Sequence, residues 1–95
     1  MSQGQKRLLS SSEIRAARAL LRWTAADLAN QSAVSLRTIR RAELTEDETS
    51  MTVANDSAVR RALEAAGVEF IDENGGGPGV RLRKSRMGQK RQKRR

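Results

Sequence analysis

The chain has no cysteine and no histidine, and its only aromatic residues are Trp23 and Phe70. It therefore lacks thiolates and imidazoles, which supply most transition-metal ligands, the thiol nucleophile and the usual general base near neutral pH. We expect no enzymatic activity, no metal site and no cofactor. The absence of disulfides is compatible with a reducing compartment.

Long apolar runs are missing as well. No run approaches the roughly 20 residues that span a bilayer, and the N-terminal residues lack the charged-then-apolar order of a secretion signal. We expect a cytoplasmic protein that does not enter membranes. Its 95 residues suit one small domain with a thin core, for which oligomerisation is a common source of added stability.

Acidic residues are absent from the C-terminal end. Residues 81–95 carry nine of the 19 Lys and Arg and none of the eleven Asp and Glu, so the excess behind the net charge of +8 lies there. Residues 84–95 have no apolar periodicity and repel one another, which predicts a disordered basic tail.

The chain does contain three similar helix starts. In each, an apolar residue precedes a capping hydroxyl, and a second apolar residue follows five positions after the first. Such a start satisfies a free backbone N–H and fixes how the chain enters the helix. The three sets are Leu9, Ser10 and Ile14; Trp23, Thr24 and Leu28; and Val34, Ser35 and Ile39. Glu13 completes a capping box with Ser10, and the spacing of Thr24 and Ser35 outlines a helix-turn-helix.

Apolar periodicity extends these starts into helices. We expect helices over residues 10–22, 25–30 and 36–44, and a fourth that starts between residues 51 and 56. Gly67 suits the C′ position of the fourth helix, where φ is usually positive. The residues expected to face the core are Ile14, Ala17, Leu20, Leu21, Leu28, Ala29, Val34, Ile39, Ala42, Val59, Ala62, Leu63 and Ala66.

After Gly67 the apolar period changes from helical to alternating, on either side of a glycine-rich loop over residues 74–79. This pattern predicts a β-hairpin. A lone hairpin is marginally stable in water, so it needs a cover, either the fourth helix or a second subunit. If a second subunit covers it, the dimer interface comprises Val68, Phe70, Ile71, Val80 and Leu82.

The chain therefore divides into four parts: an N-terminal arm (residues 1–9), a helical domain (10–67), the hairpin (68–83) and the basic tail (84–95). The expected fold is mainly α, with four to five helices and a short C-terminal hairpin.

The segment from Trp23 to Glu43 resembles the Cro/CI-type, or XRE, helix-turn-helix family of transcriptional regulators. The matching residues are Thr24, Leu28, Ala29, Val34, Ser35, Thr38, Ile39 and Glu43. The resemblance extends more loosely over residues 10–67, and residues 61–84 resemble the end of many short bacterial members. It implies a repressor-like domain whose third helix enters the DNA major groove, and a homodimer on a two-fold related operator.

The resemblance also implies roles for individual residues. Arginine suits guanine because its planar fork donates to O6 and N7 together, and leucine can pack on a thymine methyl. The implied base contacts are Leu36, Arg37, Thr38 and Arg41. The implied backbone contacts are Thr24, Ser35, Arg40, Lys84, Arg86, Lys90 and Arg91. Structural roles fall to Arg18 paired with Glu43, and to Trp23 and Ile39. The alternative to base contact is a cationic face of the third helix that is merely solvated. The alternative to the pair of Arg18 and Glu43 is two independent surface charges.

Three features depart from the family pattern. Ala25 stands where relatives place a phosphate-contacting Gln. Ala33 stands where they favour Gly, and a left-handed alanine costs on the order of 1 to 2 kcal/mol. Acidic residues 46–48, in the loop after the third helix, would be repelled by phosphate unless the loop points away from DNA or meets a basic surface.

Other functions stay open from the sequence. The chain suits a protein-interaction module, such as an antitoxin or an antiactivator target, whose hairpin or acidic loop binds a partner. A regulator can also contact polymerase. The tail alone suggests RNA or nucleoid binding. The tail is either a DNA arm, an extension that aids solubility, or an RNA or membrane contact, although membrane binding is disfavoured because no apolar face accompanies the charge.

Overall fold

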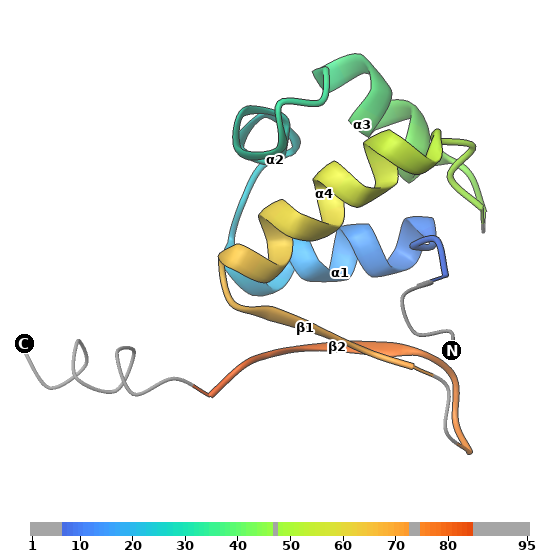
Figure 1. Ribbon diagram of the computed structural model, residues 1–95, viewed down its shortest axis with the longest axis vertical. Helices are drawn as coiled ribbons and strands as arrows, with labels where there is room; N and C mark the ends of the chain where they lie inside the picture. The colour runs from blue at the N-terminus through green and yellow to red at the C-terminus, as the bar shows by residue number, and fades with distance from the viewer. Residues whose placement is uncertain (1–6, 47, 73–74, 85–95) are drawn as a thin grey trace, which may run out of the picture.

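Four helices lie above a two-stranded antiparallel hairpin in the computed structural model, which describes residues 7–46, 48–72 and 75–84 (Figure 1). The elements are α1 (Ser11–Leu21), α2 (Ala25–Ser32), α3 (Leu36–Leu44), α4 (Val53–Ala65), β1 (Val68–Ile71) and β2 (Gly79–Leu82). α1 and α4 lie next to the hairpin, and α3 lies on the far side of the helical layer. The mainly helical class with a C-terminal hairpin is thereby confirmed.

A hydroxyl side chain starts each of the four helices. Ser10, Thr24, Ser35 and Thr52 each accept a hydrogen bond from the backbone N–H three positions on. This satisfies one of the N–H groups that a helix start leaves without a partner inside the helix. The three predicted starts and the predicted range of the fourth are confirmed. A second capping box, between Thr24 and Asp27, was not predicted.

Residues with positive φ end three of the helices. Ala33, with φ 63° and ψ 23°, forms the left-handed turn between α2 and α3. The structure therefore includes the conformational cost expected for an alanine in this region. Its N–H bonds to the Ala29 carbonyl at 2.9 Å, and the next residue, Val34, is buried in the core. Arg22 ends α1 with φ 60°, and Gly67 follows α4 with φ 114°, as expected for C′.

The core brings together apolar residues from every helix and from β1. Its buried members are Leu9, Ile14, Ala17, Leu28, Val34, Ile39, Ala42, Met51, Val59, Leu63 and Val68. Leu21, Ala29 and Ala62 are only partly buried at its edge, and Leu20 and Ala66 are wrong assignments because both are exposed. Ala66 lies at the C-cap of α4, where the helix has already left the core.

The hairpin is covered by the chain itself. β1 packs on α1 and α4, and β2 packs on α1. Val68 is fully buried, so its expected place in a dimer interface is corrected. Phe70 and Val80 pack partly against the core, whereas Leu82 keeps 49% of its surface exposed. The helical cover is therefore the one observed, and Leu82, at the rim of the hairpin, stays half open.

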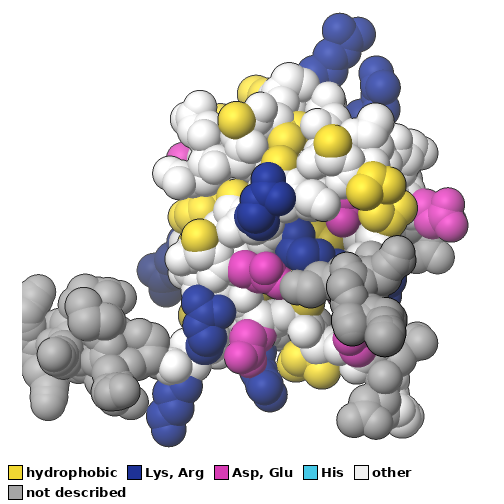
Figure 2. All heavy atoms as spheres, in the orientation of Figure 1, with side chains coloured by type: hydrophobic (Ala, Val, Ile, Leu, Met, Phe, Trp, Pro, Cys, Tyr) yellow, Lys and Arg dark blue, Asp and Glu magenta, His cyan; other side chains and the backbone are white. Residues whose placement is uncertain are grey.

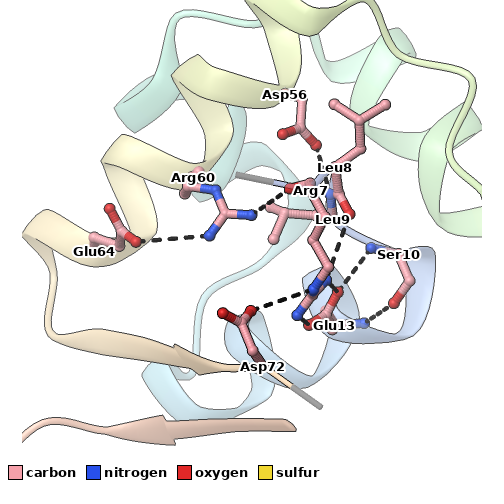
Figure 3. Close-up of polar contacts among 9 residues, drawn as sticks. All are labelled: Arg7, Leu8, Leu9, Ser10, Glu13, Asp56, Arg60, Glu64 and Asp72. Carbon is pink, nitrogen blue, oxygen red and sulfur yellow. Dashed lines mark hydrogen bonds and ion pairs between the residues drawn. The ribbon is translucent and has the colours of Figure 1, made fainter. Parts of the chain in front are cut away.

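The last residues of the expected N-terminal arm belong to the folded domain. We call residues 7–10 the N-terminal strap (Figure 3). The Arg7 guanidinium bonds both carboxylate oxygens of Glu13, at 2.8 and 2.7 Å, and lies 3.4 Å from Asp72 after β1. Leu9 fills the core, and its N–H donates to the Asp56 carboxylate at 2.9 Å. The arm boundary at residue 9 is therefore wrong, because the chain joins the fold by Arg7.

A buried arginine of α4 completes this network. Arg60 donates to the Arg7 carbonyl at 2.7 Å, and its guanidinium lies 5.1 Å from the centroid of the Phe70 ring. It also lies 3.8 Å from Glu64, one turn on. Arg60 thus joins the strap to β1, with its charge against an aromatic face.

The pKa values of the two buried carboxylates of the network are shifted in opposite directions. Burial pushes the pKa of Glu13 upward, but the hydrogen bonds from Arg7 and Ser10 outweigh it, so the pKa is lowered. Burial dominates at Asp56 and raises its pKa, although the Leu9 N–H and Arg60 act against the shift. Ionised Glu13 therefore stabilises the fold, whereas ionised Asp56 carries a cost of burial.

We predict opposite pH trends for two amide variants. As pH falls through the lowered folded pKa of Glu13, wild type loses its advantage over Glu13→Gln, because protonation removes the charge that Arg7 binds. As pH falls through the raised folded pKa of Asp56, wild type gains stability relative to Asp56→Asn, because the buried charge is neutralised. Urea unfolding followed by Trp23 fluorescence, from neutral to about pH 3, measures both differences. Two differences that do not change with pH would contradict the prediction.

Candidate nucleic-acid interface

The outward face of α3 carries three exposed arginines. Arg37, Arg40 and Arg41 are exposed, whereas Ile39 and Ala42, on the opposite side of the helix, are almost fully buried. Lys and Arg side chains project at the top of the molecule, over α3 (Figure 2). No ion pair among the described residues involves these three guanidinium groups, so their donors face solvent.

The first turn of α3 is ordered by its own hydroxyl groups. The Ser35 hydroxyl accepts the Thr38 N–H at 3.1 Å and donates to the Thr38 hydroxyl oxygen at 2.9 Å. The single donor of Ser35 is therefore in use, so a phosphate contact from Ser35 requires this bond to be exchanged. The Thr38 hydroxyl keeps its own proton for an outside acceptor. Leu36 and Thr38 are both half-buried.

The start of α2 differs in this respect. The exposed Thr24 hydroxyl accepts the Asp27 N–H at 3.0 Å, and the Asp27 carboxylate accepts the Thr24 N–H at 2.8 Å. The hydroxyl proton of Thr24 makes no bond among the described residues and is free to donate. Thr24 can therefore donate to a DNA phosphate without breaking a bond, whereas Ser35 must first give up its bond to Thr38.

An ion pair fixes the C-terminal half of α3 to α1. Arg18 Nε and Nη2 donate to the two carboxylate oxygens of Glu43, at 2.7 and 2.8 Å, and Nη1 donates to the Trp23 carbonyl at 2.9 Å. Arg18 is 23% exposed and Glu43 10%. The hydrogen bond to Glu43 raises the pKa of Arg18. The expected pair is therefore present, and the interpretation as two independent surface charges is wrong.

Two further bonds from α1 hold the end of α3. Arg15 Nη1 donates to the Glu43 carbonyl at 2.6 Å, and the Ser11 hydroxyl donates to the Thr45 carbonyl at 2.8 Å. A cation at a helix C-terminus is favourable because carbonyl groups there lack helical partners. Arg15 was not predicted, although its spacing of three from Arg18 places both residues on one side of α1.

The remaining predicted residues lie in separate places. Trp23 is half-buried against the core, which agrees with a structural role. Lys84 is exposed after β2, and Arg86, Lys90 and Arg91 lie outside the described residues. β2 lies on the other side of the helical layer from α3 (Figure 1). In the acidic loop, Glu46 and Glu48 are exposed, Asp47 is outside the described residues, and the Glu48 backbone pairs with Ser10 beside α1.

The pair between Arg18 and Glu43 should be worth more than an exposed pair of equal length. Glu43→Gln should lower the free energy of unfolding by about 2 kcal/mol, because a partly buried guanidinium loses its charged acceptor. The matched control is Glu69→Gln, since Glu69 and Arg81 also lie 2.7 Å apart but are 38% and 66% exposed. The control should lose less than about 1 kcal/mol. Equal losses in urea unfolding would show that burial does not set the strength of these pairs.

No protein-family model matches the chain, and no curated protein matches it. Within the part of the chain that the structure describes, no helix is both long enough and apolar enough to cross a bilayer.

Proposed function

We propose that the chain is a sequence-specific DNA-binding transcriptional regulator of the XRE type. In this proposal it binds a two-fold related operator as a homodimer, with α3 in the major groove and α2 across it near the backbone. One observation carries the proposal: α3 presents outward three arginines that make no ion pair with any described residue, while Ile39, Ala42 and the ion pair of Glu43 hold its other side to the body.

The exposed side chains divide between base and backbone contacts. In a helix-turn-helix, residues near the start of the second helix reach base edges. Arg37 is in the first turn of α3, and Arg41 follows one turn later on the same side, so both suit bidentate contacts to guanine. Arg40 projects to one side of this line and suits a phosphate. Leu36 and Thr38, being half-buried, have shorter reach.

Regulation in this proposal comes from occupancy. A dimer that covers or flanks a promoter represses it, and a dimer that also touches polymerase activates it. Half-sites should lie about 34 Å apart, or at a multiple of this distance, because the major groove returns to the same face of the duplex after each helical turn. The loop with Glu46 and Glu48 is anchored beside the start of α1, which supports its staying clear of phosphate.

Base-reading arginines should differ from a charge-matched arginine elsewhere. Arg37→Ala or Arg41→Ala should relax the preference at one base pair of the operator, at a cost of about 1 to 3 kcal/mol in discrimination. Arg61→Ala, which removes an exposed arginine from α4, should leave base preference unchanged. Footprinting on the DNA upstream of the gene, followed by titration of single-base variants of the protected site, measures these effects. The absence of any preferred site over bulk competitor DNA for wild type would reject the proposal.

The basic tail should act without regard to sequence. Removing residues 84–95 should weaken binding to all duplexes by a similar factor and flatten the dependence of affinity on salt, by about 0.9 in slope for each phosphate that the tail neutralises. Titrations at several salt concentrations measure this slope. If the slope does not change on truncation, the tail is not a DNA arm.

A further inference from the structure

The outer edge of β2 presents a row of backbone groups with no partner among the described residues. The register pairs Glu69 with Arg81 and Ile71 with Gly79, and the Arg83 N–H donates to the Gly67 carbonyl at 2.7 Å. This bond fixes the phase of the ladder: residues 79, 81 and 83 turn their N–H and C=O groups toward β1. Val80 and Leu82 therefore turn theirs outward, and no hydrogen bond among the described residues occupies them.

The side chains along this edge also suit further pairing. Leu82 lies on the face of the hairpin that meets the helices, yet it is 49% exposed, because β2 is the rim of the sheet there. On the opposite face Arg81 is already neutralised by Glu69 at 2.7 Å. An added strand would cover the open part of Leu82 and would meet an ion pair, not a free charge.

We propose that a second copy of the chain occupies this edge, with β2 antiparallel to β2 of the other copy in a four-stranded sheet. This inference rests on the proposed function, which requires a dimer. Only residues that turn outward can exchange bonds, which leaves few two-fold registers. The register centred on Arg81 pairs the two outward-turned residues of the strand with each other, because Val80 opposes Leu82 of the second copy. A register centred on Val80 would place Leu82 opposite Pro78, which has no N–H, and one centred on Leu82 would place Val80 opposite Lys84, beyond the strand.

This arrangement also aims both DNA-binding faces the same way. The two-fold axis of an antiparallel strand pair is normal to the sheet, so the helices of both copies lie on one side of the joint sheet. Within each copy α3 lies on the far side of the helical layer from the hairpin (Figure 1). Both α3 helices then face the same direction, as a two-fold related operator requires.

Another open apolar feature is a less suitable interface. It is a groove of about 460 Å³ lined by Leu8, Leu9, Met51 and residues 48–50. A two-fold contact there would bring the Glu48 carboxylates of both copies together, and it offers no backbone groups in strand phase. Leu8 is 48% exposed, almost the same as Leu82, and so provides a matched control.

The register can be tested by cross-linking, because the chain has no native cysteine. In Arg81→Cys the two cysteines lie opposite each other at the two-fold axis, with Cα atoms about 4.5 Å apart, within disulfide reach. In Arg83→Cys they lie two residues from the axis on each side, roughly 14 Å apart, which is too far. Mild oxidation should convert most of Arg81→Cys, and little of Arg83→Cys, to a covalent dimer. Equal conversion of the two variants would overturn the register.

The interface itself is tested by sedimentation equilibrium of the full chain. Leu82→Asp should weaken the dimer at least tenfold, and Leu82→Pro, which removes only an outward N–H, should do the same while leaving the ladder to β1 intact. Leu8→Asp should leave dimerisation unchanged. Circular dichroism and Trp23 fluorescence check folding. A monomeric wild type at about 100 μM, or dimerisation that Leu82→Asp and Leu82→Pro both leave unchanged, would overturn the inference.

The outcome is separable from that of the proposed function. If the Leu82 variants become monomeric and still prefer one half-site over random DNA, both conclusions stand. If wild type binds its operator and the Leu82 variants remain dimeric, the proposed edge interface is wrong and the proposed regulatory function stands. If wild type dimerises through β2 and prefers no duplex, the interface stands and the regulator is wrong.

Discussion

The structure depends most on how a nine-residue helix is held in one orientation. α3 is too short to be stable alone in water, and only Ile39 and Ala42 anchor it in the core. Its two ends therefore do much of the positioning. The Ser35 hydroxyl fixes its start, and α1 grips its end through Arg18 on the Glu43 side chain, with Arg15 on the Glu43 carbonyl. The direction of the exposed arginines follows from these two attachments, because neither end can rotate without breaking charged or capping bonds.

The buried polar network of the strap restricts how the parts of the chain assemble. Glu13, Asp56 and Arg60 are 5%, 3% and 8% exposed, and burying such groups is costly unless each has partners. Every buried polar side-chain atom in the described residues has a hydrogen-bond partner. The partners come from four places: the strap, α1, α4 and the end of β1. An apolar cluster would tolerate small shifts between these elements, but directional bonds to charges accept only one arrangement.

Local patterns in the sequence gave most of the fold, since caps and apolar periods are local properties. The bounds of α3 were predicted correctly, as were three capped starts, the turn at Ala33 and the hairpin. The burial of Asp56 and Arg60 was not predicted. They lie on the same side of α4 as Val59 and Leu63, and the apolar period of this helix predicts only hydrophobic residues there. Their partners, Leu9 and Arg7, are 47 and 53 positions away, so no local pattern could connect them. Val68 was misassigned because alternation shows which face is apolar and not what covers it.

Under the proposed function, two kinds of contact contribute separately to DNA binding. Contacts to phosphate set affinity and orientation for any sequence, and contacts to base edges set preference. Most of the excess positive charge follows β2 in the sequence, whereas the arginines fixed by the fold are on α3, across the helical layer from the hairpin. Affinity and specificity would then reside in different segments. The ion pair between Arg18 and Glu43 orients α3 and has no part in how the tail contacts phosphate. A change that weakens this ion pair should therefore lower the preference for the operator sequence before it lowers the total affinity for DNA.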